Sequence, residues 1–109
     1  MRSEMLKVMR KDDRTVPLLC CATCGNWIDD AGLGAAVFAS LGENGDTKEV
    51  ALVHKGACHD KAEAALRAKG LSVGWLELRR YLADALYNAG LTPARLQQMQ
   101  ADDEEFGRL

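Results

Sequence analysis

The spacing of hydrophobic positions changes several times along the chain, and each change predicts a different element. Two runs rich in Val, Ala and Leu, residues 32–41 and 47–55, flank a turn-rich stretch, residues 42–46. This stretch contains Asn44 and Gly45, a pair that tolerates the positive φ of tight hairpin turns. We therefore expect a β-hairpin. Residues 56–70 then predict a helix, with Asp60 as its cap and Gly70 at its end.

Apolar residues three and four positions apart predict a second helix over residues 71–89, which ends at Gly90. Its apolar face consists of Trp75, Leu78, Leu82 and Leu86. Thr92 and Pro93 form an N-terminal signal for a last helix, with the hydroxyl as cap and proline at the first helical position.

The expected fold class is α+β: a small hairpin and helix held by zinc, followed by two C-terminal helices. Residues 1–14 are polar and charged, and we expect a flexible or helical arm there. Residues 15–70 are predicted to form the hairpin-helix unit. Residues 71–109 are predicted to form a helical hairpin that packs on it, so that the whole chain is one domain.

The composition suggests that a cross-link such as a bound metal would help to stabilise the fold. Of the 109 residues only 6% are aromatic, so the core must rely on Leu, Val and Ala, which bury less area per residue. No stretch has 18 consecutive apolar residues, and the N-terminal segment has no apolar signal region. We therefore expect a soluble, cytoplasmic protein with reduced thiols. The net charge of −2 and a pI near 5.6 argue against a general nucleic-acid binder.

The four cysteines fall into two places. Three lie in LCCATCGNW, residues 19–27, and Cys58 lies in VHKGACHD between His54 and His59. Cys21 and Cys24 form a C-x-x-C pair, whose spacing lets two thiolates in a tight turn converge on one ion. His54 ends the second predicted strand and Cys58 begins the predicted helix, so a tetrahedral Zn²⁺ could join loop, strand and helix at one point.

In these motifs, CATCG and HKGACH, the chain resembles a treble-clef zinc finger over residues 18–70. That family combines a C-x-x-C knuckle, a β-hairpin and a helix whose first turn supplies the last ligands. The resemblance implies that Cys21 and Cys24 form the knuckle pair and that Cys58 is the ligand at the helix start. The fourth ligand is either His54 or His59. We favour His54, because adjacent Cys58 and His59 point in different directions on a helix.

Cys20 is the one cysteine that this ligand set does not include. It is either a small buried side chain on the incoming strand or a substitute for Cys21 as a ligand. Two other interpretations of the cysteines remain. They could be small buried or solvent-facing side chains, or Cys21 and Cys24 could form a redox dithiol.

The expected function is that of a protein-interaction or regulatory module, through a protein partner or self-association. Four available protein ligands suggest a closed, structural zinc site rather than a catalytic one. Zinc deaminases pair a histidine ligand with a glutamate in an H-x-E motif, and neither histidine of this chain stands in one. The alternative is a DNA-binding regulator that uses a helix-turn-helix-like pair over residues 74–100, in which Arg95, Gln97 and Gln98 could contact bases. The acidic ADDEE segment that follows would repel phosphates.

Overall fold

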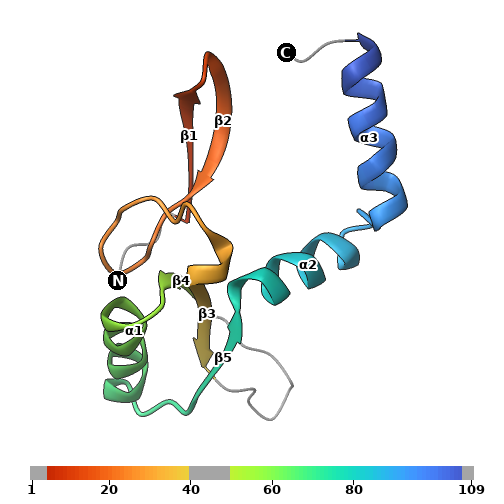
Figure 1. The fold of residues 1–109 in the computed structure, drawn as a ribbon. Coiled ribbons are helices and arrows are strands. Elements are labelled where there is room, and N and C mark those ends of the chain that lie inside the picture. The colour runs from red at the N-terminus through yellow and green to blue at the C-terminus, as the bar shows by residue number, and fades with distance from the viewer. Residues whose placement is uncertain (1–4, 40–49, 107–109) are drawn as a thin grey trace. The chain divides into compact units, whose positions relative to one another are not determined.

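The computed structural model describes residues 5–39 and 50–106 of the chain. The fold is α+β, as predicted: among the described residues there are two small antiparallel sheets and three α-helices (Figure 1). The chain forms two compact units, Met1–Arg79 and Arg80–Leu109. The first contains both sheets and the first helix, and the second contains the last helix and most of the one before it.

The first sheet is a two-stranded ribbon of β1 (Leu6–Lys11) and β2 (Arg14–Leu19). The prediction of a flexible or helical arm over residues 1–14 is therefore wrong for residues 6–14, which form β1, the turn and the first residue of β2. Asp12 and Asp13 have φ values of 52° and 61°, which is the backbone of a two-residue hairpin turn. The polar, charged composition of this segment gave no strand signal, and pairing with the following strand decided its structure.

The second sheet has the strand order β4-β3-β5 and is antiparallel throughout. It consists of β3 (Gly34–Ala39), β4 (Val50–His54) and β5 (Val73–Glu77). The pairing of β3 with β4 confirms the predicted hairpin strands, whereas the predicted turn at residues 42–46 lies outside the described residues. A short 3-10 helix, η1 (Ala31–Leu33), leads into β3 and is capped by the Asp30 carboxylate, which accepts from the Gly32 N–H at 2.8 Å.

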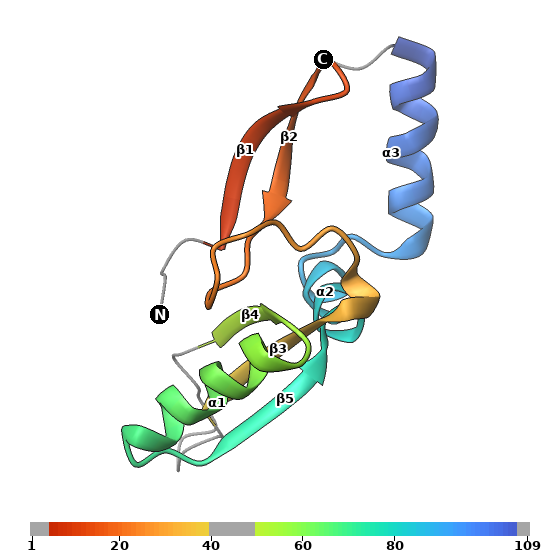
Figure 2. The same cartoon turned by 60° about the vertical axis from the view of Figure 1, so that its left-hand side comes forward.

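Helix α1 (Ala57–Ala68) lies over one face of this sheet and contacts all three strands (Figure 2). Ala62 and Leu66 are buried in that contact. The helix begins three residues before the predicted cap, Asp60, because Gly56 adopts a φ of 91° and supplies the N-cap position. It ends at Ala68, and Gly70 (φ 78°), the predicted stop signal, follows directly after the C-cap residue Lys69.

The predicted helix over residues 71–89 is correct only in its second part. Residues 73–77 form β5, which pairs with β3, and α2 (Leu78–Asn88) follows directly. The spacing from Trp75 to Leu78 suggested a helix, yet Trp75 points from the strand toward His59, with ring centroids 5.1 Å apart. β5 pairs with the side of β3 that β4 does not occupy, and this long-range pairing cannot be deduced from helical spacing.

The second unit contains most of α2 together with α3 (Pro93–Phe106). Gly90 has a φ of 88° and lies just after the end of α2. The Thr92 hydroxyl accepts from the Arg95 N–H at 3.3 Å, as the cap signal predicted. The two helices do not form a packed helical hairpin, because they make few close contacts with each other within the described residues. Tyr87 and Met99 accordingly have exposed fractions of 64% and 49%.

Packing at the start of β3 gives a prediction. A Cβ atom at Gly34 would lie 2.5 Å from Leu78 Cδ2 and 3.2 Å from Leu78 Cβ, and Leu78 is fully buried. We expect Gly34→Ala to lower the free energy of unfolding by about 1–3 kcal/mol, since a tightly packed core resists an added methyl group. Denaturant unfolding measures this, and an unchanged midpoint would show that Leu78 does not pack against Gly34.

Candidate metal centre

The C-x-x-C pair lies in a tight loop between β2 and η1. Cys20 pairs with Trp27 in an isolated β-bridge, and the Cys21 N–H donates to the Asn26 carbonyl at 2.9 Å. The Gly25 N–H then donates to the Cys21 carbonyl at 2.8 Å, in a turn where Gly25 has a φ of 78°. A side chain other than glycine is strained at this φ, so Gly25 lets the chain curl back and present both sulfurs on one side.

The other two candidate ligands come from β4 and α1. His54 is the last residue of β4, and Cys58 is in the first turn of α1. The ligand atoms of Cys21, Cys24, His54 and Cys58 all lie within 4.8 Å of one another. We refer to these four residues as the Cys3His cluster. It could hold a metal ion, and three thiolates with one imidazole are a donor set that zinc favours.

The imidazole of His54 is held with its free nitrogen toward the sulfurs. Its Nε2 lies 3.1 Å from the Trp27 carbonyl oxygen, which can only accept, so Nε2 carries the proton. In the neutral imidazole Nδ1 is then the nitrogen with the free lone pair, and it lies 3.5 Å from Cys24 Sγ. A second hydrogen bond that fixes the tautomer and the ring orientation is typical of histidine ligands.

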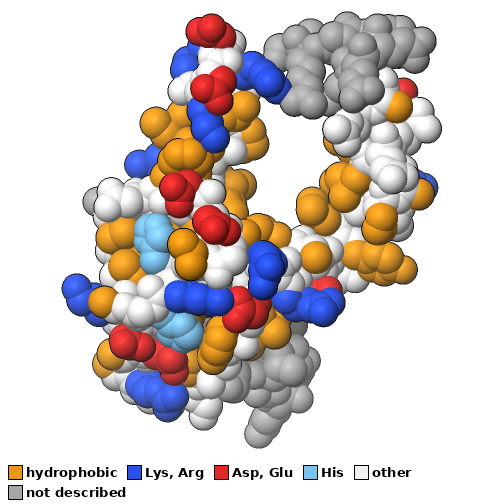
Figure 3. Space-filling model, in the orientation of Figure 1, with side chains coloured by type: hydrophobic (Ala, Val, Ile, Leu, Met, Phe, Trp, Pro, Cys, Tyr) orange, Lys and Arg blue, Asp and Glu red, His pale blue; other side chains and the backbone are white. Residues whose placement is uncertain are grey.

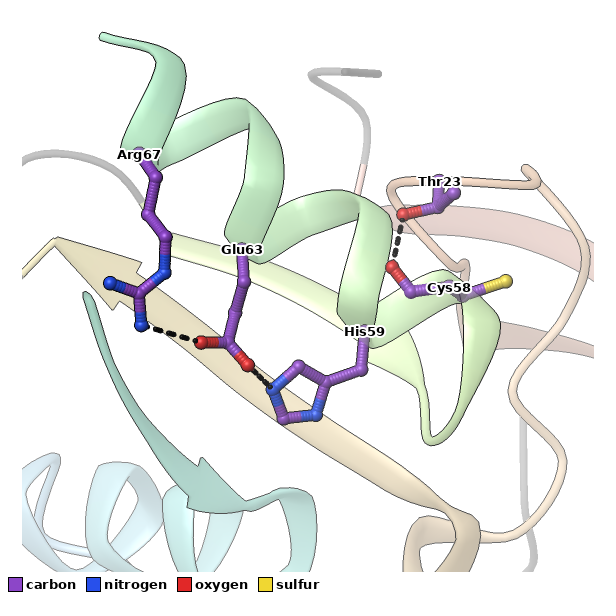
Figure 4. A network of polar contacts seen from close by, with 5 residues as sticks. All are labelled: Thr23, Cys58, His59, Glu63 and Arg67. Atoms are coloured by element: carbon purple, nitrogen blue, oxygen red, sulfur yellow. Dashed lines mark hydrogen bonds and ion pairs between the residues drawn. The ribbon is translucent and has the colours of Figure 1, made fainter. Parts of the chain in front are cut away.

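Further hydrogen bonds connect the loop to the elements that carry the later ligands. The Thr23 hydroxyl donates to the carbonyl of Cys58 at 2.9 Å (Figure 4). The Ala22 N–H donates to the Leu52 carbonyl on β4 at 2.8 Å. The loop is thus attached to both β4 and α1 by contacts that do not involve the ligand atoms. The spacing of the cysteines gave no signal for Thr23, Ala22 or the Trp27 carbonyl.

The electrostatics of the cluster differ from one thiol to the next. Burial raises the pKa of Cys21, but backbone N–H groups directed at its sulfur, above all those of Cys24 and His54, outweigh burial and lower the pKa to about 6. Burial, together with the hydrogen bond and negative charge at Cys21, raises the pKa of Cys58 to about 11. Cys58 is therefore the thiol that holds its proton more strongly than Cys21 does, and binding of a metal to Cys58 must release that proton.

The two alternate ligands lie outside the cluster. His59 is on another side of α1, where its Nε2 is 2.8 Å from Glu63 Oε2, and Glu63 also pairs with Arg67 at 3.2 Å (Figure 4). His59 Nε2 has no hydrogen-bond partner among the described residues, so its contact with Glu63 is one of proximity alone. Cys20 is buried, with an exposed fraction of 4%, in the β-bridge to Trp27.

This placement gives a prediction for the two histidines. We expect His54→Gln to lower the zinc affinity by about 100-fold or more, because a ligand and its fixed orientation are both lost. His59→Gln should leave the affinity unchanged and only lower the stability, because His59 packs between Glu63 and Trp75. Competition titration with a zinc chelator measures both. A larger loss of affinity in His59→Gln would mean that His59 is the ligand.

Comparison with known proteins gives no relative. No family model matches the chain, and neither a curated protein nor a solved structure is similar to it. Among the helices of residues 5–39 and 50–106, none is long and apolar enough to span a bilayer. The Cys3His cluster is therefore the feature from which a function can be argued.

Proposed function

We propose that the chain is a zinc-binding protein in which the metal is a structural element, and that it acts as an interaction module rather than as an enzyme. The observation that carries this proposal is the convergence of Cys21, Cys24, His54 and Cys58 within 4.8 Å. Four protein ligands complete a tetrahedral zinc shell and leave no position for a reactive water. A catalytic zinc site normally keeps such a position open.

The order of the elements supports the structural role. The knuckle with Cys21 and Cys24 is followed by the β3-β4 hairpin and then by α1, and each supplies at least one ligand or leads to one. This is the plan of a treble-clef zinc finger, the family that the cysteine motifs resemble. One ion at this point would connect three elements that are separated by as many as 37 residues in sequence (58 minus 21).

A redox dithiol is the less favoured role for Cys21 and Cys24. Reactive C-x-x-C pairs depend on a helix N-terminus that stabilises the attacking thiolate. Here a turn ends at Cys24, and the backbone from there to η1 is irregular apart from the isolated bridge at Trp27, so no α-helix begins at the pair. The presence of a third thiol and an imidazole at the same point also favours a metal site.

A DNA-binding role for α2 and α3 is also less favoured. Helix-turn-helix units depend on close packing between their two helices, and α2 and α3 make few close contacts within the described residues. In α3, moreover, the Gln98 amide donates to Asp102 at 3.0 Å instead of being free to read a base. Loss of DNA affinity with rising salt would reveal this role if it exists.

Metal analysis tests the proposal. Freshly prepared, reduced protein should contain about one zinc per chain, as a closed four-ligand site binds one ion. Protein that contains no zinc, and takes up none from a zinc-buffered solution, would contradict it. Detection of a disulfide in the protein as isolated under reducing conditions would favour the redox role instead.

A further inference from the structure

The two edges of the β1-β2 ribbon differ in their free hydrogen-bonding groups. Val8 pairs with Pro17, and proline has no N–H, so this is a pair without mutual hydrogen bonds. Because pairs alternate along an antiparallel ladder, Leu6, Val8 and Arg10 point their backbone N–H and C=O groups away from β2. The Cys20 N–H donates to the Met5 carbonyl at 2.9 Å, which agrees with this alternation.

The outer edge of β2 is largely closed. The outward-pointing carbonyl of Leu19 accepts from the Ile28 N–H at 2.9 Å. Pro17 has no donor to offer, and a proline on an edge strand discourages the addition of another strand. Within the part of the chain that the structure describes, Thr15 is the one residue of this edge that keeps both an outward N–H and an outward C=O without a backbone partner.

The outer edge of β1 is open. Within residues 5–39 and 50–106, no backbone partner is found for the outward groups of Leu6, Val8 and Arg10. All six residues of β1 are exposed, and Leu6 and Val8 have exposed fractions of 62% and 69%. A two-stranded ribbon is marginally stable by itself, and a third strand would stabilise it.

The charge of the open edge is positive. Lys7, Arg10 and Lys11 lie on β1, and this strand has no acidic residue. The ribbon's acids, Asp12 and Asp13, are confined to the turn. Figure 3 shows basic and hydrophobic side chains side by side along the ribbon. Lys7 and Lys11 lie on one face with Met9, and Arg10 lies on the other with Leu6 and Val8.

We propose that the outer edge of β1 binds an extended, acidic segment of a partner protein, which adds to the ribbon as a third strand. Backbone hydrogen bonds from Leu6, Val8 and Arg10 provide affinity, and carboxylates opposite the basic side chains provide specificity. The occupant should alternate apolar and acidic residues, because alternation places its acids on one face, opposite Lys7 and Lys11, and its apolar side chains on the other, opposite Leu6 and Val8. This inference rests on the proposed interaction role but not on the metal, so zinc binding and peptide binding can fail separately.

Two other occupants fit less well. A second copy of the chain would bring its own three β1 cations beside these three, and like charges next to each other oppose pairing. A nucleic acid would satisfy the cations but would leave the outward amides without a matched backbone and the apolar side chains without a partner.

The test uses full-length, zinc-loaded protein and a fluorescein-labelled octapeptide of alternating Glu and Val. The peptide should bind, with amide shift changes largest at Leu6, Val8 and Arg10. The Lys/Val analogue should bind roughly tenfold more weakly or worse, because its charge is repelled. A Glu/Val peptide should not bind when it is N-methylated at the three residues whose backbone N–H groups point toward β1. Methylation of the residues whose N–H groups point away from β1 should be tolerated.

Two proline variants form a matched pair. Val8→Pro removes an outward N–H from the open edge, and Thr15→Pro removes one from the other edge, so neither breaks a backbone hydrogen bond between β1 and β2. Thr15→Pro also removes the hydroxyl that accepts from Arg10 at 3.3 Å, and Thr15→Val is the control for that loss. Val8→Pro should lower the affinity for the Glu/Val peptide by roughly tenfold or more, while Thr15→Pro leaves it unchanged. Unchanged zinc content and unchanged amide shifts in α1 verify that both variants are folded.

Three results would overturn the proposal. The first is equal affinity for the Glu/Val and Lys/Val peptides. The second is shift changes at β1 with single-stranded DNA but not with the Glu/Val peptide. The third is a concentration-dependent dimer that Val8→Pro dissociates in a protein that does not bind the peptide, which would assign the edge to a second copy.

Discussion

Removal of zinc with a chelator is expected to lower the thermal midpoint of the protein by about 10 °C or more. The free energy of binding to a site that exists only in the folded chain is also free energy of folding. Without the ion, hydrogen bonds such as those from Thr23 to the Cys58 carbonyl and from Ala22 to the Leu52 carbonyl still attach the loop to α1 and β4, but the four ligand side chains lose the bonds that would join them. Scanning calorimetry before and after chelation measures the change.

Hydrogen exchange shows where the stabilisation is lost. Amides of the loop at residues 20–28 and of the first turn of α1 should lose protection on chelation, and added zinc should restore it. Amides of α3 belong to the other compact unit and should exchange as before. A midpoint that chelation leaves unchanged would show that the metal does not stabilise the fold.

Alanine at Cys21 is expected to have a far larger effect than alanine at Cys20. Both side chains are buried, with exposed fractions of 0% and 4%, and both substitutions remove the same atom. Only Cys21 belongs to the Cys3His cluster. Cys20→Ala should therefore cost about 1 kcal/mol from the small cavity, with zinc affinity unchanged. Cys21→Ala should cost the same and, in addition, lower zinc affinity by about 100-fold or more.

The two variants are compared by denaturant unfolding with and without chelator. Cys20→Ala should still be destabilised when the metal is removed, as the unmodified chain is. Cys21→Ala should respond little to chelation, because most of its metal is already lost. Equal responses of the two variants would mean that the assignment of Cys21 as the knuckle ligand is wrong.

The small size of the core side chains explains why a metal would matter in this fold. The buried residues of β3, β4 and α1 include Ala35, Ala36, Ala51 and Ala62. Alanine buries little apolar surface compared with leucine or phenylalanine, so the sheet and helix gain less from the hydrophobic effect than most domains of this length. An ion that joins the knuckle, the hairpin and the helix would add stability to elements that bury little apolar surface.

Local chemistry made part of the structure predictable. The C-x-x-C spacing and the glycine after it indicated a knuckle, and Gly70 and Gly90 correctly marked the ends of two helices. The β3-β4 hairpin followed from two apolar runs around a turn-rich segment. Each of these signals depends on a few neighbouring residues, and the conformation of those residues is set by their own sterics.

The parts that failed depend on distant partners. Residues 6–11 and 73–77 both have spacings that are compatible with a helix, and each became a strand because another segment offered an edge to pair with. The hydrogen bond from His54 to the Trp27 carbonyl likewise has no signal in the sequence, because a backbone carbonyl is common to every residue. Side-chain type therefore indicated the four candidate ligands that lie together but not the groups that orient them.

X-ray absorption at the zinc edge tests most directly whether these four residues hold the metal. The Cys3His cluster predicts three sulfur neighbours at about 2.3 Å and one nitrogen at about 2.0–2.1 Å. The nitrogen should disappear from the spectrum of His54→Gln and remain in that of His59→Gln. A first shell of four sulfurs, two nitrogens, or mainly oxygen in the unmodified protein would contradict this account.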